Sequence, residues 1–359
     1  MAQRAESEFT LDTAAELAAV EGGGAAIRGR SPWYLAWRRL RRNYFAFAAL
    51  ALFLLIVLAC ILAPLYAHHV AHSGPYDQHV LDTITVHGKK LDVVSPGGVI
   101  NGKLQASAPI GPQWFAAGGK FVLGADVLGR DIAVRLLYGG RNSLLVGVAS
   151  SAICVFFAVI LALLAGYYGG WIDFIITRFF DLFYAFPVLL LGIALGSALA
   201  INGFHHGPIN IQSGNILIPL LVISYVLIPY IGRPLRGQVL SLREKEFVEA
   251  SISQGASALR VMFSELLPNI ASSVLVFFTL IIANNIVLEA ALSYLGAGVQ
   301  DPTPSWGKLI SEGQQLIVTR PALALAPGIA IILTVLALNI FGDGLRDALD
   351  PRAKVRVEH

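Results

Sequence analysis

The sequence predicts an all-α integral membrane protein with six transmembrane helices. Of its 359 residues, 56% are hydrophobic and 14% are charged, and the mean hydropathy is +0.67. Soluble domains carry charge on about a quarter of their residues, so this composition excludes an ordinary soluble domain. A spanning helix needs about 20 mainly apolar residues. Six stretches meet that requirement: residues 45–63, 144–164, 182–201, 216–231, 270–288 and 322–341.

The third and fourth stretches are less regular than the others. The fourth is the shortest and contains Pro219 and Pro229, which remove backbone donors and bend helices. Pro187 has the same effect in the third stretch. We therefore expect six spans, two of them interrupted or bent by proline.

The distribution of basic residues predicts how the spans are oriented. An even number of spans puts both termini on one side of the membrane. If that side is the cytoplasm, 17 of the 26 lysines and arginines fall in inside segments, and most of the others lie in one long outside loop. Because lysine and arginine accumulate on the cytoplasmic side, both termini are expected there.

These spans divide the chain into five parts. Residues 1–43 form a cytoplasmic tail with a basic juxtamembrane segment, 44–67 the first transmembrane helix, 68–142 an external loop or insert, 143–342 a core of five transmembrane helices with a cytoplasmic loop at 236–269, and 343–359 a cytoplasmic tail. The first 30 or so residues lack the apolar density to pack and are expected to be disordered. The first apolar run is longer than the roughly 7–15 residues of a signal peptide, which favours an uncleaved anchor.

The external loop is expected to contain a small β-rich insert. Residues 82–86 and 91–94 alternate between polar and apolar, as strands with one buried face do. Five histidines lie in or beside this region, namely His68, His69, His72, His79 and His87. Their spacing matches no compact ligand set, so we predict exposed loop histidines and no metal site. Cys60 and Cys154 lie in apolar runs and are expected to be buried free thiols.

A polar segment between the fourth and fifth spans has the pattern of a helical hairpin. Glu246, Glu249 and Ala250 are spaced i, i+3, i+4, so they share one helix face. Val248 and Ile252 share another face. A short helix with an acidic face beside an apolar one suits docking of a partner. An ordinary solvated loop with capped helices is the alternative.

The remainder of this segment supports the same interpretation. Ser251 is small, which lets a partner surface approach the helix closely, and Gly255 permits the left-handed conformation that ends a helix. Residues 261–267 then predict a second amphipathic segment that runs to Pro268, just before the fifth span.

The pattern Glu249-Ala250-Ser251, Gly255 and then Leu267-Pro268 resembles the EAA loop of permease subunits in bacterial ATP-binding-cassette importers. Residues 123–131 (LGADVLGRD) and 135–144 (RLLYGGRNSL) are similar to a segment of the C-type permease subunits of dipeptide, oligopeptide and nickel importers. Further similar segments follow in order at 166–178, 236–240, 292–307 and 342–352. Ala125 stands where this family usually has threonine, and Glu265 where peptide permeases have histidine.

The external motif is marked by Asp126, Gly129, Arg130 and Asp131. Glycines permit tight turns, and an aspartate before Ile132 can cap the helix that begins there. A folded cap before the second span is therefore as good an explanation of this motif as contact with a substrate.

The resemblance implies the type I importer permease fold in the inner membrane of a bacterial cell. It also implies a second, B-type permease subunit, two ATPase subunits that bind the ATP and magnesium, and an external peptide-binding protein. The residues that would couple to the ATPase are Glu246, Glu249, Ala250, Ser251, Gly255, Leu267 and Pro268. Membrane lipid surrounds such a subunit, and neither a bound cofactor nor a nucleic-acid partner is expected.

Polar residues in or near the spans are candidates for the transport pathway. Asn284 and Asn285 lie within the fifth span, and Glu289 lies near its outer end. Such groups line pathways or bridge helices inside bundles, and both readings remain open. Asp173 and Arg178, at the inner end of the second and third spans, are expected to form interfacial ion pairs with their neighbours, Asp181 included.

The chain carries no sequence motif for hydrolysis. It has no Gly-x4-Gly-Lys-Ser/Thr phosphate loop, no Gly-x-Ser-x-Gly nucleophile elbow and no HExxH. We therefore expect a non-catalytic translocation subunit that imports di- or oligopeptides. Import of nickel or glutathione is the alternative within the same architecture. An ion-coupled secondary transporter would show internal repeats, and an anchored enzyme would need catalytic residues in the insert.

Overall fold

The computed structural model describes residues 32–100, 103–105, 107–206 and 209–349. The tail predicted to be disordered lies outside these residues. Five helices in the described part are long and apolar enough to cross a membrane, counting the turns before α11 with it. They are α3 (Tyr44–Ile61), α5 (Ile132–Tyr168), α8 (Leu217–Arg243), α11 (Leu267–Tyr294) and α13 (Ala322–Leu349). The predicted all-α membrane fold is confirmed.

The third predicted span is not one continuous helix. Residues 182–201 fall on α6 (Gly170–Tyr184) and α7 (Val188–Asn202), which meet at an angle of 89°. Pro187 lies at the break, where it has no N–H to donate and disfavours helical geometry in the residue before it. The described chain therefore has six spans only if this bent pair crosses the membrane as one.

Several predicted boundaries move because helices continue beyond the apolar stretches. Residues 132–142, assigned to the external loop, are the first turns of α5, and residues 236–243 of the cytoplasmic loop are the end of α8. The fourth span is an unbroken helix with Pro229 and Pro234 inside it. Helix α13 runs on to Leu349, past the predicted boundary at 342. Hydrophobicity marks where a helix meets lipid, whereas the helix itself continues while its backbone bonds are satisfied.

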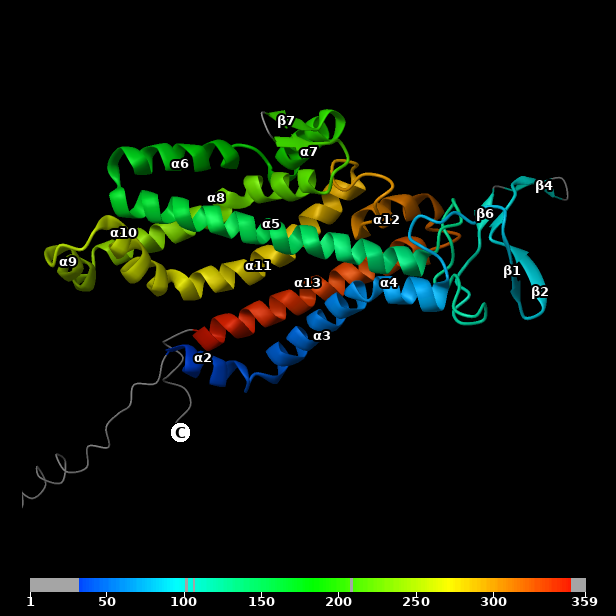
Figure 1. Cartoon of the computed structure of the whole chain (residues 1–359), viewed down its shortest axis with the longest axis horizontal. Coiled ribbons are helices and arrows are strands. Elements are labelled where there is room, and N and C mark those ends of the chain that lie inside the picture. Colours follow the sequence, from blue (N-terminus) through cyan, green and yellow to red (C-terminus); the bar gives the residue numbers. More distant parts are fainter. Residues whose placement is uncertain (1–31, 101–102, 106, 207–208, 350–359) are drawn as a thin grey trace, which may run out of the picture.

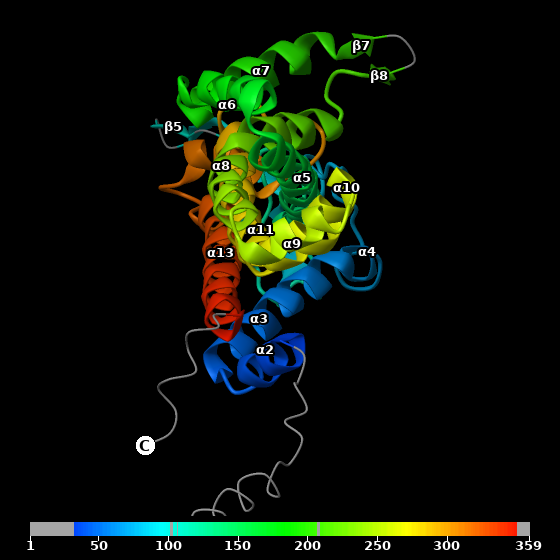
Figure 2. The same ribbon diagram turned by 90° about the vertical axis from the view of Figure 1, so that its left-hand side faces the viewer.

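The spans pack in three layers (Figure 2). Helices α3 and α13 form one side, α6 and α7 the opposite side, and α5, α8 and α11 lie between them. Helix α5 makes its most extensive contacts with α8, and small residues permit their close approach. A Cβ at Gly166 would lie 2.5 Å from the Val239 side chain, so only glycine fits there.

Figure 1 shows that different helices and strands lie at the two ends of this bundle. The short helix α9 (Glu246–Ser253), helix α2 (Pro32–Leu40) and the C-terminal end of α13 gather at one end. Helix α12 (Trp306–Gly313) and the insert between α3 and α5 lie at the other. The two ends therefore bear separate candidate sites.

The insert contains the predicted β-structure. After α4 (Ala63–Tyr66) and the π-helix η1 (Ala67–Ala71), strand β1 (Thr83–Val86) pairs antiparallel with β2 (Lys89–Asp92), with Thr83 opposite Asp92. Two further antiparallel pairs are β3 (Val94–Ser95) with β6 (Ala108–Pro109), and β4 (Gly98–Ile100) with β5 (Lys103–Gln105). The strands β7 (Phe204–His206) and β8 (Ile209–Ile211) form a separate hairpin between α7 and α8.

Candidate functional site

The predicted helical hairpin is present at the end of the bundle that carries α2. Helix α9 is followed by α10 (Ala258–Arg260) and a π-helical turn, η2 (Val261–Leu266), which continues directly into α11. Leu267 and Pro268 are therefore the first residues of α11, with no loop before them. Glu246, Glu249 and Ala250 are exposed on α9, as their shared helix face predicts.

Helix α9 is fixed to the spans by one buried side chain. Val248 is fully buried in a cluster with Leu163 of α5, Val239 of α8, and Val261 and Leu266 of η2. Burying a valine contributes about 1.5–3 kcal/mol. Helix α9 is therefore packed against α8 and η2, and η2 continues into α11.

The turn after α9 is a Schellman motif. Gly255 has a φ of +81° and donates its N–H to the Ile252 carbonyl at 2.9 Å. The Ala256 N–H donates to the Ser251 carbonyl at 3.1 Å. This pair of bonds is the pattern that satisfies the last carbonyls of a helix when glycine follows it. The predicted left-handed role of Gly255 is confirmed.

The hairpin also exposes apolar side chains: Ile252, which the sequence places on the apolar face of α9, and three that the sequence reasoning did not single out. Phe247 is 40% exposed, Ile252 47%, Leu259 63% and Phe263 54%. Together with the acidic residues of α9 they form a mixed acidic and apolar surface, which we call the hairpin surface. Exposed apolar groups that gather in one short segment can mark an interaction site. A signal was available for Phe247, because it is adjacent to Val248 in sequence and so lies on a different face of α9.

At the opposite end, the residues of the predicted external motif form a buried ionic cluster. Asp126 accepts hydrogen bonds from the Leu128 and Arg130 backbone N–H groups at 2.9 and 3.0 Å. Its other oxygen accepts from Arg130 Nε at 2.7 Å and from Arg135 Nη1 at 2.6 Å. Gly129, with a φ of +71°, makes the turn that brings Arg130 back to Asp126.

Two members of this cluster were missed by the sequence reasoning. Arg135, fully buried in the first turn of α5, donates from Nη2 to Glu312 Oε1 of α12 at 3.2 Å, and Nη1 forms a shorter bond to Glu312 Oε2. Arg130 Nη2 also reaches Glu312 at 3.4 Å. We call Asp126, Arg130, Arg135 and Glu312 the external clasp. It joins the external motif, α5 and α12.

Asp131 caps α5, as predicted. Its Oδ1 accepts the N–H groups of Ala133 at 2.9 Å and Val134 at 3.2 Å, and its Oδ2 accepts the Phe121 N–H at 2.7 Å. Burial raises the pKa of this carboxyl above its ordinary value, and the three N–H donors act in the opposite direction. The contacts of the external motif are thus with its own fold, which supports its structural role.

Of the three pathway candidates, only Asn284 faces a cavity. It lines a groove of about 600 Å³ between α7, α8 and α11. The other walls are mainly apolar and include Leu189 of α7, Tyr230 of α8, and Phe277 and Val287 of α11. This groove is the candidate transport surface of the chain.

Asn285 and Glu289 are fully buried between helices in this arrangement, so neither lines the groove that Asn284 faces. The Asn285 amide lies 2.8 Å from the Ser150 hydroxyl and 2.9 Å from the Ser151 hydroxyl, both on α5. Both residues follow the alternative prediction, in which polar groups bridge helices inside a bundle. Each occupies a different face of α11 from Asn284, because residues one and five positions apart do not align on a helix.

Ion pairs connect α6 to α8 near the hairpin. Asp173 accepts hydrogen bonds from Arg236 Nε and Nη2, and Asp181 accepts from Arg233. Arg178 contacts Asp181 at 3.2 Å. The predicted interfacial ion pairs are confirmed, and their main partners are the arginines of α8.

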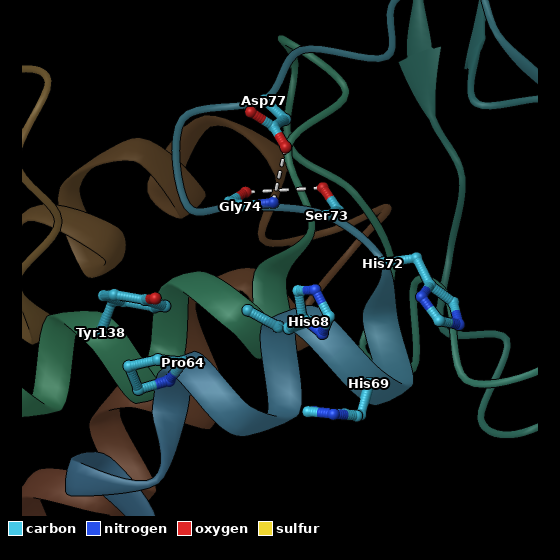
Figure 3. A pocket seen from close by; sticks show the side chains of 9 residues that line it. Pro64, His68, His69, His72, Ser73, Gly74, Asp77 and Tyr138 are labelled. Atoms are coloured by element: carbon cyan, nitrogen blue, oxygen red, sulfur yellow. Dashed lines mark hydrogen bonds between the residues drawn. The ribbon is translucent and has the colours of Figure 1, made fainter.

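The histidines at the start of the insert do not converge. A pocket of about 770 Å³ is lined by His68, His69 and His72, which point in different directions (Figure 3). Asp77 in this pocket accepts the Gly74 N–H at 2.6 Å. In the part of the chain that the structure describes, no group of three or more histidine, cysteine, aspartate or glutamate side chains could hold a metal ion.

A second set of polar residues ties the start of the insert together. Ser73 Oγ lies 2.9 Å from His79 Nε2, and His79 Nδ1 lies 2.7 Å from Asp82 Oδ2. The contacts run from Ser73 to His79 to Asp82, the same order as a serine nucleophile, its histidine base and the carboxylate that orients the base. However, the N–H that follows the serine, that of Gly74, is occupied by Asp77, so it cannot stabilise an oxyanion. The chain of bonds is best explained as fixing the loop.

The sequence matches identify the family. Residues 158–355 match the binding-protein-dependent transport system inner membrane component, and residues 31–84 match the N-terminal transmembrane domain of oligopeptide transport permease C. The chain belongs to this permease family. The predicted membership among the permeases of ATP-binding-cassette importers is thereby confirmed, and with it the type I permease fold.

Individual relatives of this permease cover nearly its whole length. The dipeptide transport system permease protein DppC of Alkalihalophilus pseudofirmus is 37% identical over 324 residues, which is 90% of this chain and 91% of that protein. The glutathione transport system permease protein GsiD of Escherichia coli O157:H7 is 39% identical over 331 residues, 90% of this chain and 92% of that protein. Among solved structures, the inward-facing MetNI methionine transporter aligns with a TM-score of 0.47 and 16% identity, over 60% of this chain and 96% of that one.

Proposed function

We propose that this chain is the C-type permease subunit of an ATP-driven importer of di- or oligopeptides. The observation that carries the proposal is the hairpin surface in a member of this family. It is exposed, acidic and apolar, and the helix that bears it is anchored by Val248 in an apolar cluster with side chains of the spans. It provides a docking surface for a separate ATPase, and the chain itself catalyses no hydrolysis.

The proposed complex contains this chain, a B-type permease, two ATPase subunits and an external peptide-binding protein. ATP and magnesium belong to the ATPase subunits. The hairpin and both termini face the cytoplasm of a bacterial cell, and the insert faces outward, as the distribution of lysine and arginine favours. The groove that contains Asn284 forms this subunit's wall of the path.

The coupling mechanism follows from the packing of α9. Closure of the ATPase subunits on ATP moves the hairpin surface. Since Val248 is buried in one apolar cluster with side chains of α5, α8 and η2, the movement displaces these elements together. Rotation of α8 and α11 changes the width of the groove between them, which opens the path outward. Hydrolysis then allows the inward-open arrangement to return.

The substrate is assigned to peptides because of the relationship to a dipeptide permease. Glutathione is a second candidate, since the glutathione permeases are equally similar. Nickel is favoured by no observation beyond the family resemblance. The groove has mainly apolar walls and one amide, which suits a path that slides varied peptides along without binding them tightly.

The test is purification of the chain with its partners in a mild detergent, followed by mass spectrometry and an ATPase assay. We expect a second permease and ATPase subunits to co-purify. Hydrolysis should rise with peptide-loaded binding protein and less with the glutathione-loaded or nickel-loaded form. Stimulation by glutathione alone would replace the proposed substrate, and a chain that purifies without ATPase subunits would contradict the coupling role.

A further inference from the structure

The buried carboxylate of Glu289 is the centre of a polar cluster that the proposed function does not use. Glu289 lies near the outer end of α11 and is fully buried. Its Oε1 accepts the Ser293 hydroxyl at 2.6 Å, and the side chains of Ser143 and Ser305 also interact with the carboxylate. The remaining oxygen, Oε2, is buried without a formed hydrogen bond.

One of the three hydroxyls, that of Ser293, donates to this carboxylate, and the other two lie beside it. Each one accepts a backbone N–H: Ser143 from Trp306 at 3.1 Å, Ser293 from Val299 at 2.9 Å, and Ser305 from Lys308 at 3.2 Å. A hydroxyl that accepts from a backbone donor still has its own proton to give. Ser293 therefore links the carboxylate to the backbone of the segment 297–313, and Ser143 and Ser305 hold two further N–H groups of that segment beside it.

This segment, which contains α12, is pressed tightly against α5 and α11. The Trp306 indole N–H donates to the Leu136 carbonyl at 3.0 Å, and the Asn142 amide donates to the Pro304 carbonyl at 2.7 Å. A Cβ at Gly307 would collide with the Ala290 backbone. The position of α12 is thus determined by contacts with the two helices that Glu289 and Ser143 belong to.

The cluster lies at the outer end of the candidate path. The groove extends along α11 from Phe277 to Ala291, so its outermost residue lies between Glu289 and Ser293 in sequence. Segment 297–313 follows directly and covers that end of the helix. The external clasp holds the other end of α12 through Glu312.

We propose that Glu289 and its three serines are a latch that positions α12 at the outer end of the path during transport. The inference rests on the proposed function. In the closed arrangement the Ser293 hydroxyl donates to the carboxylate, and Ser143 and Ser305 lie beside it. When α12 moves away, water in the open path solvates it instead. The carboxylate then has hydrogen-bond donors in both arrangements, and the unpartnered Oε2 gains a partner when α12 moves, as suits an element that switches between two states.

The test uses the whole complex, reconstituted in lipid, with the variants Glu289→Gln and Ser305→Ala. Glutamine replaces one acceptor oxygen by an N–H₂ donor that faces hydroxyl donors, and alanine removes one link. Ser224→Ala is the matched control, because Ser224 is a buried serine whose hydroxyl donates only to Leu220 of its own helix, at 2.7 Å. Amide hydrogen exchange and peptide uptake are both measured.

We expect both latch variants to raise amide exchange in 297–313 by about tenfold, the effect of one lost buried hydrogen bond. The maximum uptake rate should fall by a similar factor. The concentration of loaded binding protein that gives half-maximal uptake should stay unchanged, because docking takes place outside the latch. A role in folding alone would instead lower the amount of complex and leave the rate per complex intact.

Two results would overturn the latch. One is wild-type exchange and uptake in both variants. The other is faster exchange spread evenly over α5 and α11, which would show general loosening of the bundle. Hydrogen exchange needs no substrate, so a wild-type complex that fails to import peptides would contradict the proposed function and leave this test of the latch intact.

Discussion

Single residues at the hairpin have separable roles, because some hold its shape and others form its surface. Gly255 determines the turn after α9, and Val248 anchors the helix. Glu249 is exposed, and its side chain forms no hydrogen bond within the described residues. Substitution of Glu249 should therefore affect the binding of partners and not the fold. This difference allows shape and surface to be tested one residue at a time.

Gly255→Val should uncouple ATP hydrolysis from transport. Open space surrounds a Cβ at this position, so the cost comes from the left-handed backbone, about 1–2 kcal/mol. We expect a normal yield of complex, with ATPase activity retained and peptide uptake reduced at least severalfold. Gly237→Ala is the control, since its Cβ is also unobstructed but its backbone is helical. Equal uptake by the Gly255 variant and wild type would refute the prediction.

Glu249→Arg should also impair coupled uptake, but by weakening the contact with the ATPase and without a structural effect. Reversing an exposed charge changes folding by less than about 0.5 kcal/mol, whereas at an interface it opposes docking. We expect loss of co-purifying ATPase subunits or loss of coupled uptake. Asp92→Arg on exposed strand β2, at the other end of the molecule, should leave both intact. If the two variants behave alike, α9 is not the ATPase contact.

At the scale of elements, the external clasp decides how α12 sits against α5. It unites a turn, a helix start and a short helix that are far apart in sequence, and Arg135 is fully buried within it. A buried charge that loses its partners is costly, whereas the pair itself adds little net stability. The clasp is therefore better regarded as a device that fixes position than as a source of stability.

Arg135→Ala should destabilise the protein by about 3–5 kcal/mol, because Asp126 and Glu312 lose a buried partner. A lower midpoint in thermal unfolding of the purified complex would report this loss. Arg141→Ala, on the exposed side of the same helix, should change the midpoint little. Adding Glu312→Gln to Arg135→Ala should recover part of the loss, and strict additivity of the two changes would mean that the residues do not interact.

At the scale of the whole molecule, the hairpin and the insert lie at opposite ends of the bundle (Figure 1). The bundle between them is continuous, because α5 alone extends over 37 residues. That length, about 55 Å at 1.5 Å per residue, exceeds the thickness of a bilayer core. The ends therefore protrude into water on opposite sides, where different partners can reach them.

This arrangement can be tested with single cysteines. Cys60 and Cys154 are buried, so replacing both with alanine should give a background without reactive thiols. In that background, Asp92→Cys should react with an impermeant maleimide added outside intact spheroplasts. Ser253→Cys should react only after the membrane is opened. Labelling of both from outside would place the hairpin on the wrong side for a cytoplasmic ATPase.

Local features were determined by the sequence itself. Apolar runs, proline positions, alternating strands, the cap at Asp131 and the glycine turn after α9 all depend on residues near one another in the chain, and the structure contains each of them. The family motifs could be read for the same reason. What the sequence could not provide was the rotation of each apolar helix about its own axis.

Only the tertiary structure decided which polar residues face the path. Helix α11 is apolar nearly all round, so its sequence has no stripe that distinguishes one face from another. Packing against α5 and α12 buries Asn285 and Glu289 and leaves Asn284 exposed. The pairing of Arg135 with Glu312 likewise depends on where distant helices meet. Lipid is as apolar as the interior of the bundle, so hydrophobicity does not determine which face of a helix is buried. Close packing between helices determines it instead.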